Sequence, residues 1–173
     1  MGMFSNELMV TSQNTTIGHF VSMKKEGHLY LDADYQREYV WTRDQQQCLL
    51  ESIFHRIPLG GISVVVDPKS SDKYLEVVDG KQRLTTILKF VDNEFPYIDE
   101  YGNFLYYRDL DVVDQRTFTN VILPSNELRE DGVRKPSRLQ ILKFFYRVNF
   151  GGTPQAESHR RKVANMIAEE KGI

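Results

Sequence analysis

The residues best suited to chemistry form one short run between two regular elements, Asp79-Gly80-Lys81-Gln82-Arg83. The β-branched stretch before this run is typical of a strand, and the last three residues of the run open a helical pattern. The first turn of a helix carries unpaired backbone N–H groups and the positive end of the helix dipole. A strand, a glycine turn and a helix start with two cations therefore predict an anion site, above all for phosphate. The alternative interpretation is that Asp79 caps an ordinary helix whose cations are solvated.

A second polar segment is a candidate for the same site, Tyr35-Gln-Arg-Glu-Tyr-Val-Trp41. Its Gln36–Arg37 pair resembles the Gln82–Arg83 pair, and two such pairs can converge on one polar ligand. An aromatic-rich strand is more often part of the core and its rim, and we expect Trp41 to pack inward.

The C-terminal third is basic, although the whole chain has a net charge of −2. From Arg129 onward ten lysines and arginines face five acids, a balance of +5, which leaves −7 for residues 1–128. This third is a candidate contact for DNA or another polyanion, although solvated helix faces explain most of these charges. Within it, Arg147 and Asn149 precede a glycine pair. They either contact a phosphate or base, or form an ordinary helix end.

Metal and nucleophile chemistry have less support. The four histidines are scattered without metal-ligand spacing, and His159 is expected to be solvated. One nuclease arrangement remains, because Asp67 and Asp79-x-Lys81 have the order of a magnesium site with two carboxylates and a lysine. A glycine breaks the strand between the second carboxylate and the lysine, which weighs against it. Cys48, the only cysteine, is expected to be buried in a helix and cannot form an internal disulfide.

The elements that must position these residues are predicted from hydrophobic periods and end signals. Helices are expected over 15–26, 42–57, 80–92 and 137–150, with a last helix starting at Thr153-Pro154. Extended or strand segments are expected over 29–41, 62–66, 74–78, 95–98, 103–107 and 118–123, and a charged loop over 129–136. The 62–66 and 74–78 runs should form a hairpin. The result is a small α+β domain with its helices concentrated at both ends of the chain.

Length and composition agree with one soluble globular domain. The 173 residues are 40% hydrophobic, and no apolar run approaches the about 20 residues that cross a membrane. No secretory signal is visible at the N-terminus, and cysteine is nearly absent. A reducing, cytoplasmic setting without membrane contact is therefore expected.

Three motifs in order resemble the N-terminal domain of GmrSD-type modification-dependent restriction enzymes. They are Tyr35-Gln-Arg-x-Tyr-Val-Trp41, Leu50-Glu-Ser-Ile-x-x-x-Ile-Pro-Leu-Gly60 and Val78-Asp-Gly-Lys-Gln-Arg-Leu-Thr-Thr86. The later Phe145-Tyr-Arg-Val-Asn-x-Gly-Gly152 is similar to the family's helix-ending pattern. The resemblance covers about residues 15–165. It implies one ParB/sulfiredoxin-like domain over 1–173, a small mixed sheet flanked by helices. In a departure from the family, no effector nuclease domain is expected in this chain.

The resemblance also implies binding and hydrolysis of a nucleoside triphosphate with Mg²⁺. Asp79 would hold the metal ion or a water, Arg83 a phosphate, and Gln82 the ligand or the water. The remaining binding residues would be Gly80, Lys81, Gln36, Arg37, Arg147 and Asn149. Lys81 stands where the family usually has glutamine, and its charge suits phosphate.

Three functions follow as hypotheses. The first is a nucleotide-hydrolysing module that acts with DNA or with a separate effector or defence protein. The second is a non-enzymatic interaction protein of a phage or mobile element, which binds DNA or a defence complex. The third is a magnesium-dependent DNA-nicking enzyme that uses Asp67 and Asp79.

Overall fold

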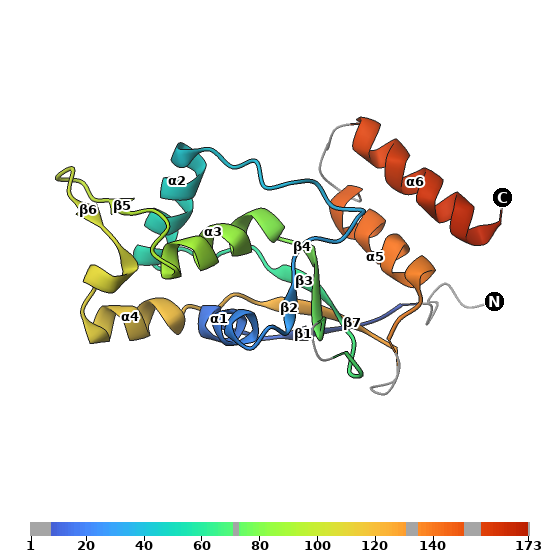
Figure 1. The fold of residues 1–173 in the computed structure, drawn as a ribbon, viewed down its shortest axis with the longest axis horizontal. Helices are drawn as coiled ribbons and strands as arrows, with labels where there is room; N and C mark the ends of the chain where they lie inside the picture. The colour runs from blue at the N-terminus through green and yellow to red at the C-terminus, as the bar shows by residue number, and fades with distance from the viewer. Residues whose placement is uncertain (1–7, 71–72, 131–134, 151–156, 173) are drawn as a thin grey trace.

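The computed structural model describes residues 8–70, 73–130, 135–150 and 157–172 as an α+β fold. The five strands of the main sheet lie in the order β1-β7-β3-β4-β2, with bounds Met9–Gln13, Ser125–Arg129, Ile62–Val66, Leu75–Asp79 and Leu29–Tyr30. A two-stranded sheet pairs β5 with β6, Tyr97–Ile98 with Phe104–Leu105. The helices are α1 (Ile17–Lys25), α2 (Arg43–Phe54), α3 (Lys81–Val91), the 3₁₀ turn η1 (Tyr107–Asp109), α4 (Val112–Thr119), α5 (Arg138–Phe150) and α6 (Glu157–Lys171). Figure 1 shows the arrangement.

The main sheet is mixed, and each of its faces has its own core. Strand β3 runs antiparallel to β4 and parallel to β7. Successive side chains of a strand point to opposite faces. Accordingly, Val64 and Val66 join the core formed with α1 to α4, whereas Val65 joins the core formed with α5 and α6. The predicted mixed sheet flanked by helices, with a helical C-terminal end, is confirmed.

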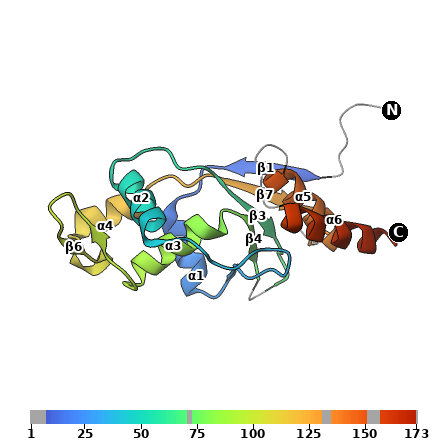
Figure 2. The same cartoon turned by 90° about the horizontal axis from the view of Figure 1, so that it is seen from above.

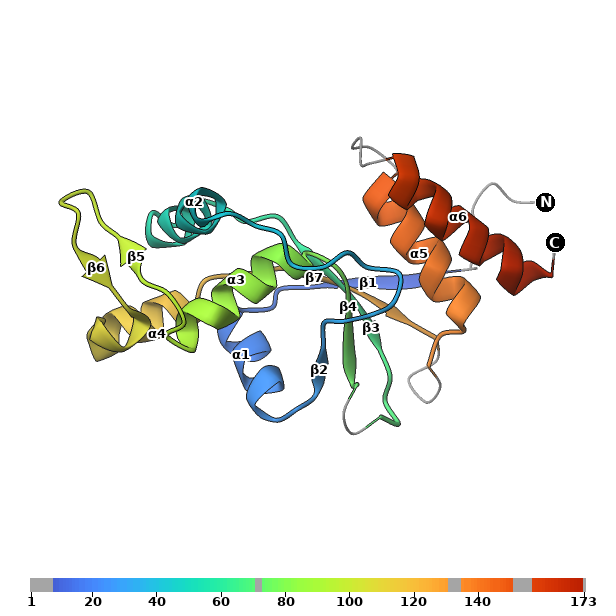
Figure 3. The same ribbon diagram turned by 45° about the horizontal axis from the view of Figure 1, so that its top comes forward.

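The two ends of the molecule differ in charge. Figure 2 and Figure 3 show α5 and α6 side by side at one end, and the β5–β6 hairpin with α4 at the other. Residues 92–114, which reach from the end of α3 into α4, contain seven acids and one arginine. The basic third begins with the last residue of β7 and supplies α5 and α6. No helix among the described residues combines the length and apolarity needed to cross a membrane.

Local end signals marked the starts of α2 and α5 correctly, whereas α4 was not predicted. Thr42 and Gln45 form the predicted capping box at the start of α2. Before α5, the N–H of Ser137 donates to Oε1 of Gln140 at 2.8 Å, and the N–H of Gln140 donates to Oγ of Ser137 at 3.3 Å. The 62–66 and 74–78 runs form the predicted hairpin. Strands β5 and β6, which pair antiparallel, lie within the strand segments expected over 95–98 and 103–107. The predicted start of the last helix at Thr153-Pro154 lies outside the described residues.

The strand predicted over 118–123 is wrong, and the strands β1 and β7 were not predicted. Phe118 lies in the last turn of α4 and is 2% exposed, so its apolar signal came from a helix that packs on the core. The strand that follows α4 is β7, and its last residue, Arg129, was predicted to lie in the charged loop. The exposed strand β1 pairs with β7. Of the extended 29–41 segment only Leu29–Tyr30 pairs with a neighbour.

The expectation that Cys48 is buried is also wrong. Leu49 and Ile53 lie on the buried side of α2, one helical turn apart, and Cys48 is exposed. Successive helix residues are about 100° apart, so the residue before a core position can face solvent. This cysteine carries no structural role in the core.

Gly80 determines how the chain passes from β4 into α3. Its φ is +88°, in the left-handed region, and a Cβ at this position would overlap the side chain of Ile62. Ile62 is completely buried and cannot move aside freely. Gly80 is also the residue before the first turn of α3, and no side chain caps that turn. The alternative in which Asp79 caps the helix is therefore not what the fold contains.

We expect Gly80→Ala to destabilise the fold more than Gly102→Ala. Both glycines have a left-handed φ, which disfavours alanine by about 1 kcal/mol, but Gly102 has open space around its missing Cβ. The overlap with Ile62 should add about 1–3 kcal/mol to the effect at Gly80. Urea unfolding of both variants measures the difference. Equal losses of unfolding free energy would contradict the packing argument.

Candidate anion-binding site

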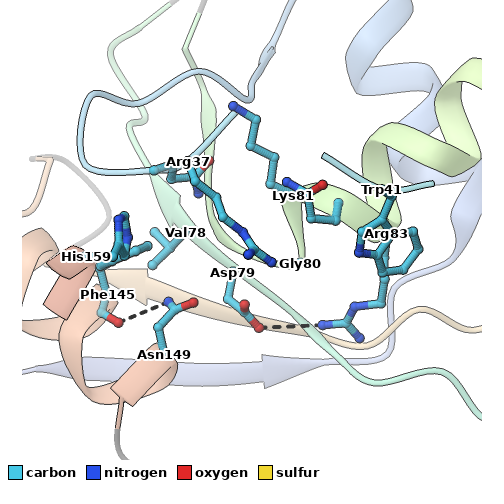
Figure 4. A pocket seen from close by; sticks show the side chains of 12 residues that line it. Arg37, Trp41, Val78, Asp79, Gly80, Lys81, Arg83, Phe145, Asn149 and His159 are labelled. Atoms are coloured by element: carbon cyan, nitrogen blue, oxygen red, sulfur yellow. Dashed lines mark hydrogen bonds and ion pairs between the residues drawn. The ribbon is translucent and has the colours of Figure 1, made fainter. Parts of the chain in front are cut away.

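A cavity of about 170 Å³ lies where β4 meets α3. It is enclosed by the segment after β2, by the first turn of α3 and by α5 and α6, and Figure 4 shows its side chains. All predicted site residues except Arg147 line it, together with four others: Gln36, Arg37, Trp41, Val78, Asp79, Gly80, Lys81, Gln82, Arg83, Phe145, Asn149 and His159. The structure therefore brings the two Gln/Arg pairs together, as the sequence predicted.

Arg83 is held at the floor of the junction by two partners. Its Nη2 donates to the carbonyl of Gly61 at 2.8 Å and lies 3.5 Å from Oδ2 of Asp79, one helical turn before it. A Cβ at Gly60 would overlap the same guanidinium, which therefore lies directly against the Gly60 backbone. About one fifth of the Arg83 side chain stays exposed, 22%. Arg83 is thus held in place by these two partners, and the carboxylate of Asp79 balances part of its charge.

The segment 36–41 is attached to β4 and α3 by side-chain bonds to backbone. Gln36 donates through Nε2 to the carbonyl of Val77, at 2.5 Å. Gln82 donates to the carbonyl of Glu38 and accepts from the N–H of Val40, both at 2.9 Å. Both ends of the Gln82 amide are therefore occupied. Its role in this geometry is to hold the segment rather than to orient a ligand.

Arg37 and Lys81 differ in their partners. Lys81 donates through Nζ to Oδ1 of Asp32 at 2.9 Å. Arg37 is exposed and has no hydrogen bond or ion pair with any described residue. In Figure 4 the Arg37 guanidinium points into the cavity towards Gly80, while the Lys81 amine points away from Asp79. Arg37 thus faces an uncapped helix start and has no counter-ion in the part of the chain that the structure describes.

Helices α5 and α6 close the other side with an amide and two rings. Phe145 and Asn149 lie four residues apart on one side of α5, and Asn149 donates to the Phe145 carbonyl at 3.1 Å. The His159 ring of α6 lies edge-on to Phe145 at 5.8 Å. Arg147, two residues beyond Phe145, is exposed and does not line the cavity. The prediction for Arg147 is therefore corrected, because about 200° of helical rotation separates it from the Phe145 side.

His159 is a site residue that the sequence did not indicate. It was expected to be solvated, but it is half-buried and lines the cavity. Burial lowers its pKa, and the positive charges of Lys162 and Arg37 lower it further. No local pattern could have revealed this position, since it depends on how α6 packs against α5. Trp41, expected inside, both packs on the core and lines the cavity.

Ion pairs fasten the same segment to the C-terminal helices. Arg138 forms ion pairs with Oδ2 of Asp34 at 2.7 Å and with Glu170 at 3.1 Å. Lys162 donates a hydrogen bond to the backbone carbonyl of Asp34 at 3.1 Å. The bond from Arg138 lowers the pKa of the Asp34 carboxyl. The cavity walls are thereby linked across α5, α6 and the segment after β2.

The two-carboxylate nuclease site is not assembled. Ser63 pairs with Asp79 in the antiparallel hairpin, and Asp67 lies beyond the other end of β3, so about 13 Å separates the two residues along the strand. Asp67 lies 3.9 Å from Lys135 instead. No group of three metal-ligating side chains occurs among the described residues. The third hypothesis therefore lacks its site.

An α+β domain with a cavity lined by arginine and lysine side chains at a strand–glycine–helix junction is the class that this geometry defines. The chain matches the family model described as GmrSD restriction endonuclease, N-terminal domain, over residues 17–166, and it belongs to this family. Comparison with curated proteins and with solved structures found no match. Membership associates the chain with restriction systems.

We expect the pKa of His159 to lie below its usual value of about 6.5 and to rise in Arg37→Ala. Removing a neighbouring positive charge favours the protonated imidazole. An NMR titration of the histidine ring measures both values. Arg147→Ala, an exposed change on α5 outside the cavity, is the control that should leave this pKa unchanged. An unchanged value in Arg37→Ala would contradict the placement of these two side chains.

Proposed function

We propose that this domain binds a nucleoside triphosphate at the start of α3 and hydrolyses it. The observation that carries the proposal is the Arg37 guanidinium, which lacks a counter-ion among the described residues and faces the uncapped first turn of α3. An uncapped helix start offers backbone N–H groups and a positive dipole to phosphate oxygens. Arg83 adds a second guanidinium beside the same turn.

The proposed roles follow from the contacts of each residue. Arg37 and Arg83 bind phosphate oxygens. They stabilise the charge that develops as water attacks the terminal phosphorus and the nucleoside diphosphate leaves. Asp79, which is held by Arg83, positions the attacking water or the metal ion. Gly80 lets the phosphates approach the backbone closely. Gln36 and Gln82 hold the segment that carries Arg37.

Mg²⁺ fits this arrangement as a companion of the triphosphate. Asp79 is the only carboxylate among the described residues that line the cavity. Magnesium sites in nucleotide enzymes commonly use one or two carboxylates, with phosphates and waters as the other ligands. When bound, the ion neutralises charge on the phosphates. We propose Asp79 as its protein ligand.

The nucleotide base is proposed to lie beside the rings of Phe145 and His159, which approach the cavity from α5 and α6. Trp41 lies across the cavity from them, beside Arg83 (Figure 4). Flat rings stack on any base, with little preference for its identity. Asn149 adds a polar group at that side.

We expect nucleoside triphosphates with Mg²⁺ to change the fluorescence of Trp41, the single tryptophan of the chain, in a saturable way. Arg37→Ala and Arg83→Ala should each weaken binding by about tenfold to a hundredfold, because each removes a charge-assisted bond of about 1.5–3 kcal/mol. Asp79→Asn should retain binding and lose phosphate release. A fluorescence titration and a phosphate-release assay measure these effects.

Arg147→Ala is the matched control, since it removes an arginine of α5 that does not line the cavity. It should bind like the wild type. Circular dichroism of each variant excludes unfolding as the cause of a loss. No saturable signal with any of the four common nucleotides, or wild-type affinity in Arg37→Ala, would refute the proposal.

A contact with DNA is proposed for the exposed basic residues of α6. Arg160 and Arg161 lie on this helix with 52% and 78% of their side chains exposed. Exposed cations of this kind bind phosphate backbones without sequence preference. This contact would allow nucleotide occupancy to act on a restriction system through DNA, beside any protein partner.

We expect the double variant Arg160→Ala, Arg161→Ala to reduce the salt dependence of DNA binding by about two phosphate contacts. The double variant Lys24→Ala, Lys25→Ala makes the same charge change at the end of α1 and should have no such effect. Fluorescence anisotropy with labelled duplex DNA at several salt concentrations measures the slope. Equal slopes in both variants would reject α6 as the contact.

A further inference from the structure

Lys81 is a cation of the cavity that is already engaged elsewhere. It lies in the first turn of α3, yet its Nζ is bonded to Oδ1 of Asp32 at 2.9 Å. The Lys81 side chain is 10% exposed and the Asp32 side chain is 77% exposed. A mostly buried lysine side chain is therefore paired with a carboxylate that water can reach. Such a carboxylate can be displaced, because little of its own hydration has to change.

The sheet explains why Asp32 is there. Strand β2 pairs in parallel with β4, so the carboxyl ends of both strands meet at one edge of the sheet. Asp32 lies two residues beyond β2, and Asp79 is the last residue of β4. The Tyr30 hydroxyl donates to the Asp32 carbonyl at 2.9 Å and fixes this turn. The same edge thus presents Asp32 and Asp79 on two sides of the α3 start.

The two carboxylates at this edge have different partners. Asp79 is paired with Arg83, and Asp32 is paired with Lys81. Arg37, from the segment that follows Asp32, has no counter-ion among the described residues. Among the described cations that line the cavity, an entering anion therefore meets Arg37 first, because Lys81 and Arg83 are already paired. It gains the charge of Lys81 only by replacing Asp32.

We propose that Asp32 is a built-in competitor of the ligand, which holds Lys81 until a phosphate chain of sufficient charge replaces it. This inference rests on the proposed nucleotide site and adds the source of its selectivity for a triphosphate. A single phosphate reaches Arg37 and the helix start, but its charge is too small to offset the free energy lost when the Asp32–Lys81 ion pair breaks. A longer phosphate chain occupies Arg37 and attracts Lys81 with its additional charge.

Inorganic tripolyphosphate and inorganic phosphate are suitable probes, because they remove the unknown base from the test. We expect Asp32→Asn to bind tripolyphosphate about two- to fivefold tighter than the wild type, the range of an exposed ion pair. Its preference for tripolyphosphate over phosphate should fall. The thermal midpoint of the free variant should fall, and its rise on adding tripolyphosphate should be larger than in the wild type, because Lys81 then lacks its counter-ion until the ligand arrives.

Two further variants identify the route of the effect. In a Lys81→Gln background, Asp32→Asn should no longer change the affinity, because the carboxylate acts through Lys81. Asp92→Asn is the matched charge control, since Asp92 ends α3 about 16 Å from its start. It should leave the affinity for tripolyphosphate within the error of the wild type.

The outcomes separate this inference from the proposed function. If the wild type binds neither tripolyphosphate nor any nucleoside triphosphate, both ideas fail. If the wild type binds and Asp32→Asn binds equally or more weakly, the competitor role fails and the nucleotide site stands. If Asp32→Asn tightens binding equally in the Lys81→Gln background, the effect is one of net charge, and the competitor role fails as well.

Discussion

The cavity depends on the backbone at Gly80. The chain leaves β4 there with a φ of +88°, against a buried Ile62 that leaves no room for a Cβ. This tight passage starts α3 directly at the sheet edge and leaves its first turn without a capping side chain. It also sets Asp79 and Arg83 one helical turn apart, so that they pair across the junction. The cavity and the uncapped helix start beside it are a consequence of that single turn.

The second wall of the cavity is built differently, from a segment with almost no strand pairing. Gln36, Tyr39 and Gln82 tie it to β4 and α3 through hydrogen bonds of 2.5–2.9 Å. Buried polar groups are stabilising only when they are paired, so these bonds fix the position of the segment narrowly. Arg138 and Asp34 then fasten it to α5. A ligand in the cavity therefore contacts three separate parts of the chain.

Several elements around the cavity could be predicted from the sequence, because they depend on residues close together in the chain. Capping boxes act over three residues, so Thr42 and Ser137 marked helix starts correctly. The β3–β4 hairpin and the strand–glycine–helix junction are local patterns too. Strands β1 and β7 were missed because the first is fully exposed and the second is rich in polar residues, and neither shows the alternation of a half-buried strand. They are strands because they pair with each other and with β3.

The sequence by itself singled out the strand–glycine–helix junction and two Gln/Arg pairs that could converge, and the structure places both pairs in the lining of one cavity. The tertiary structure decided their roles. Parallel pairing of β2 with β4 brought Asp32 to Lys81, while Arg37 was left without a counter-ion among the described residues. The packing of α6 on α5 brought His159 into the cavity. Residue type and local spacing fix what a side chain can do, but its partner is set by contacts between segments far apart in the chain.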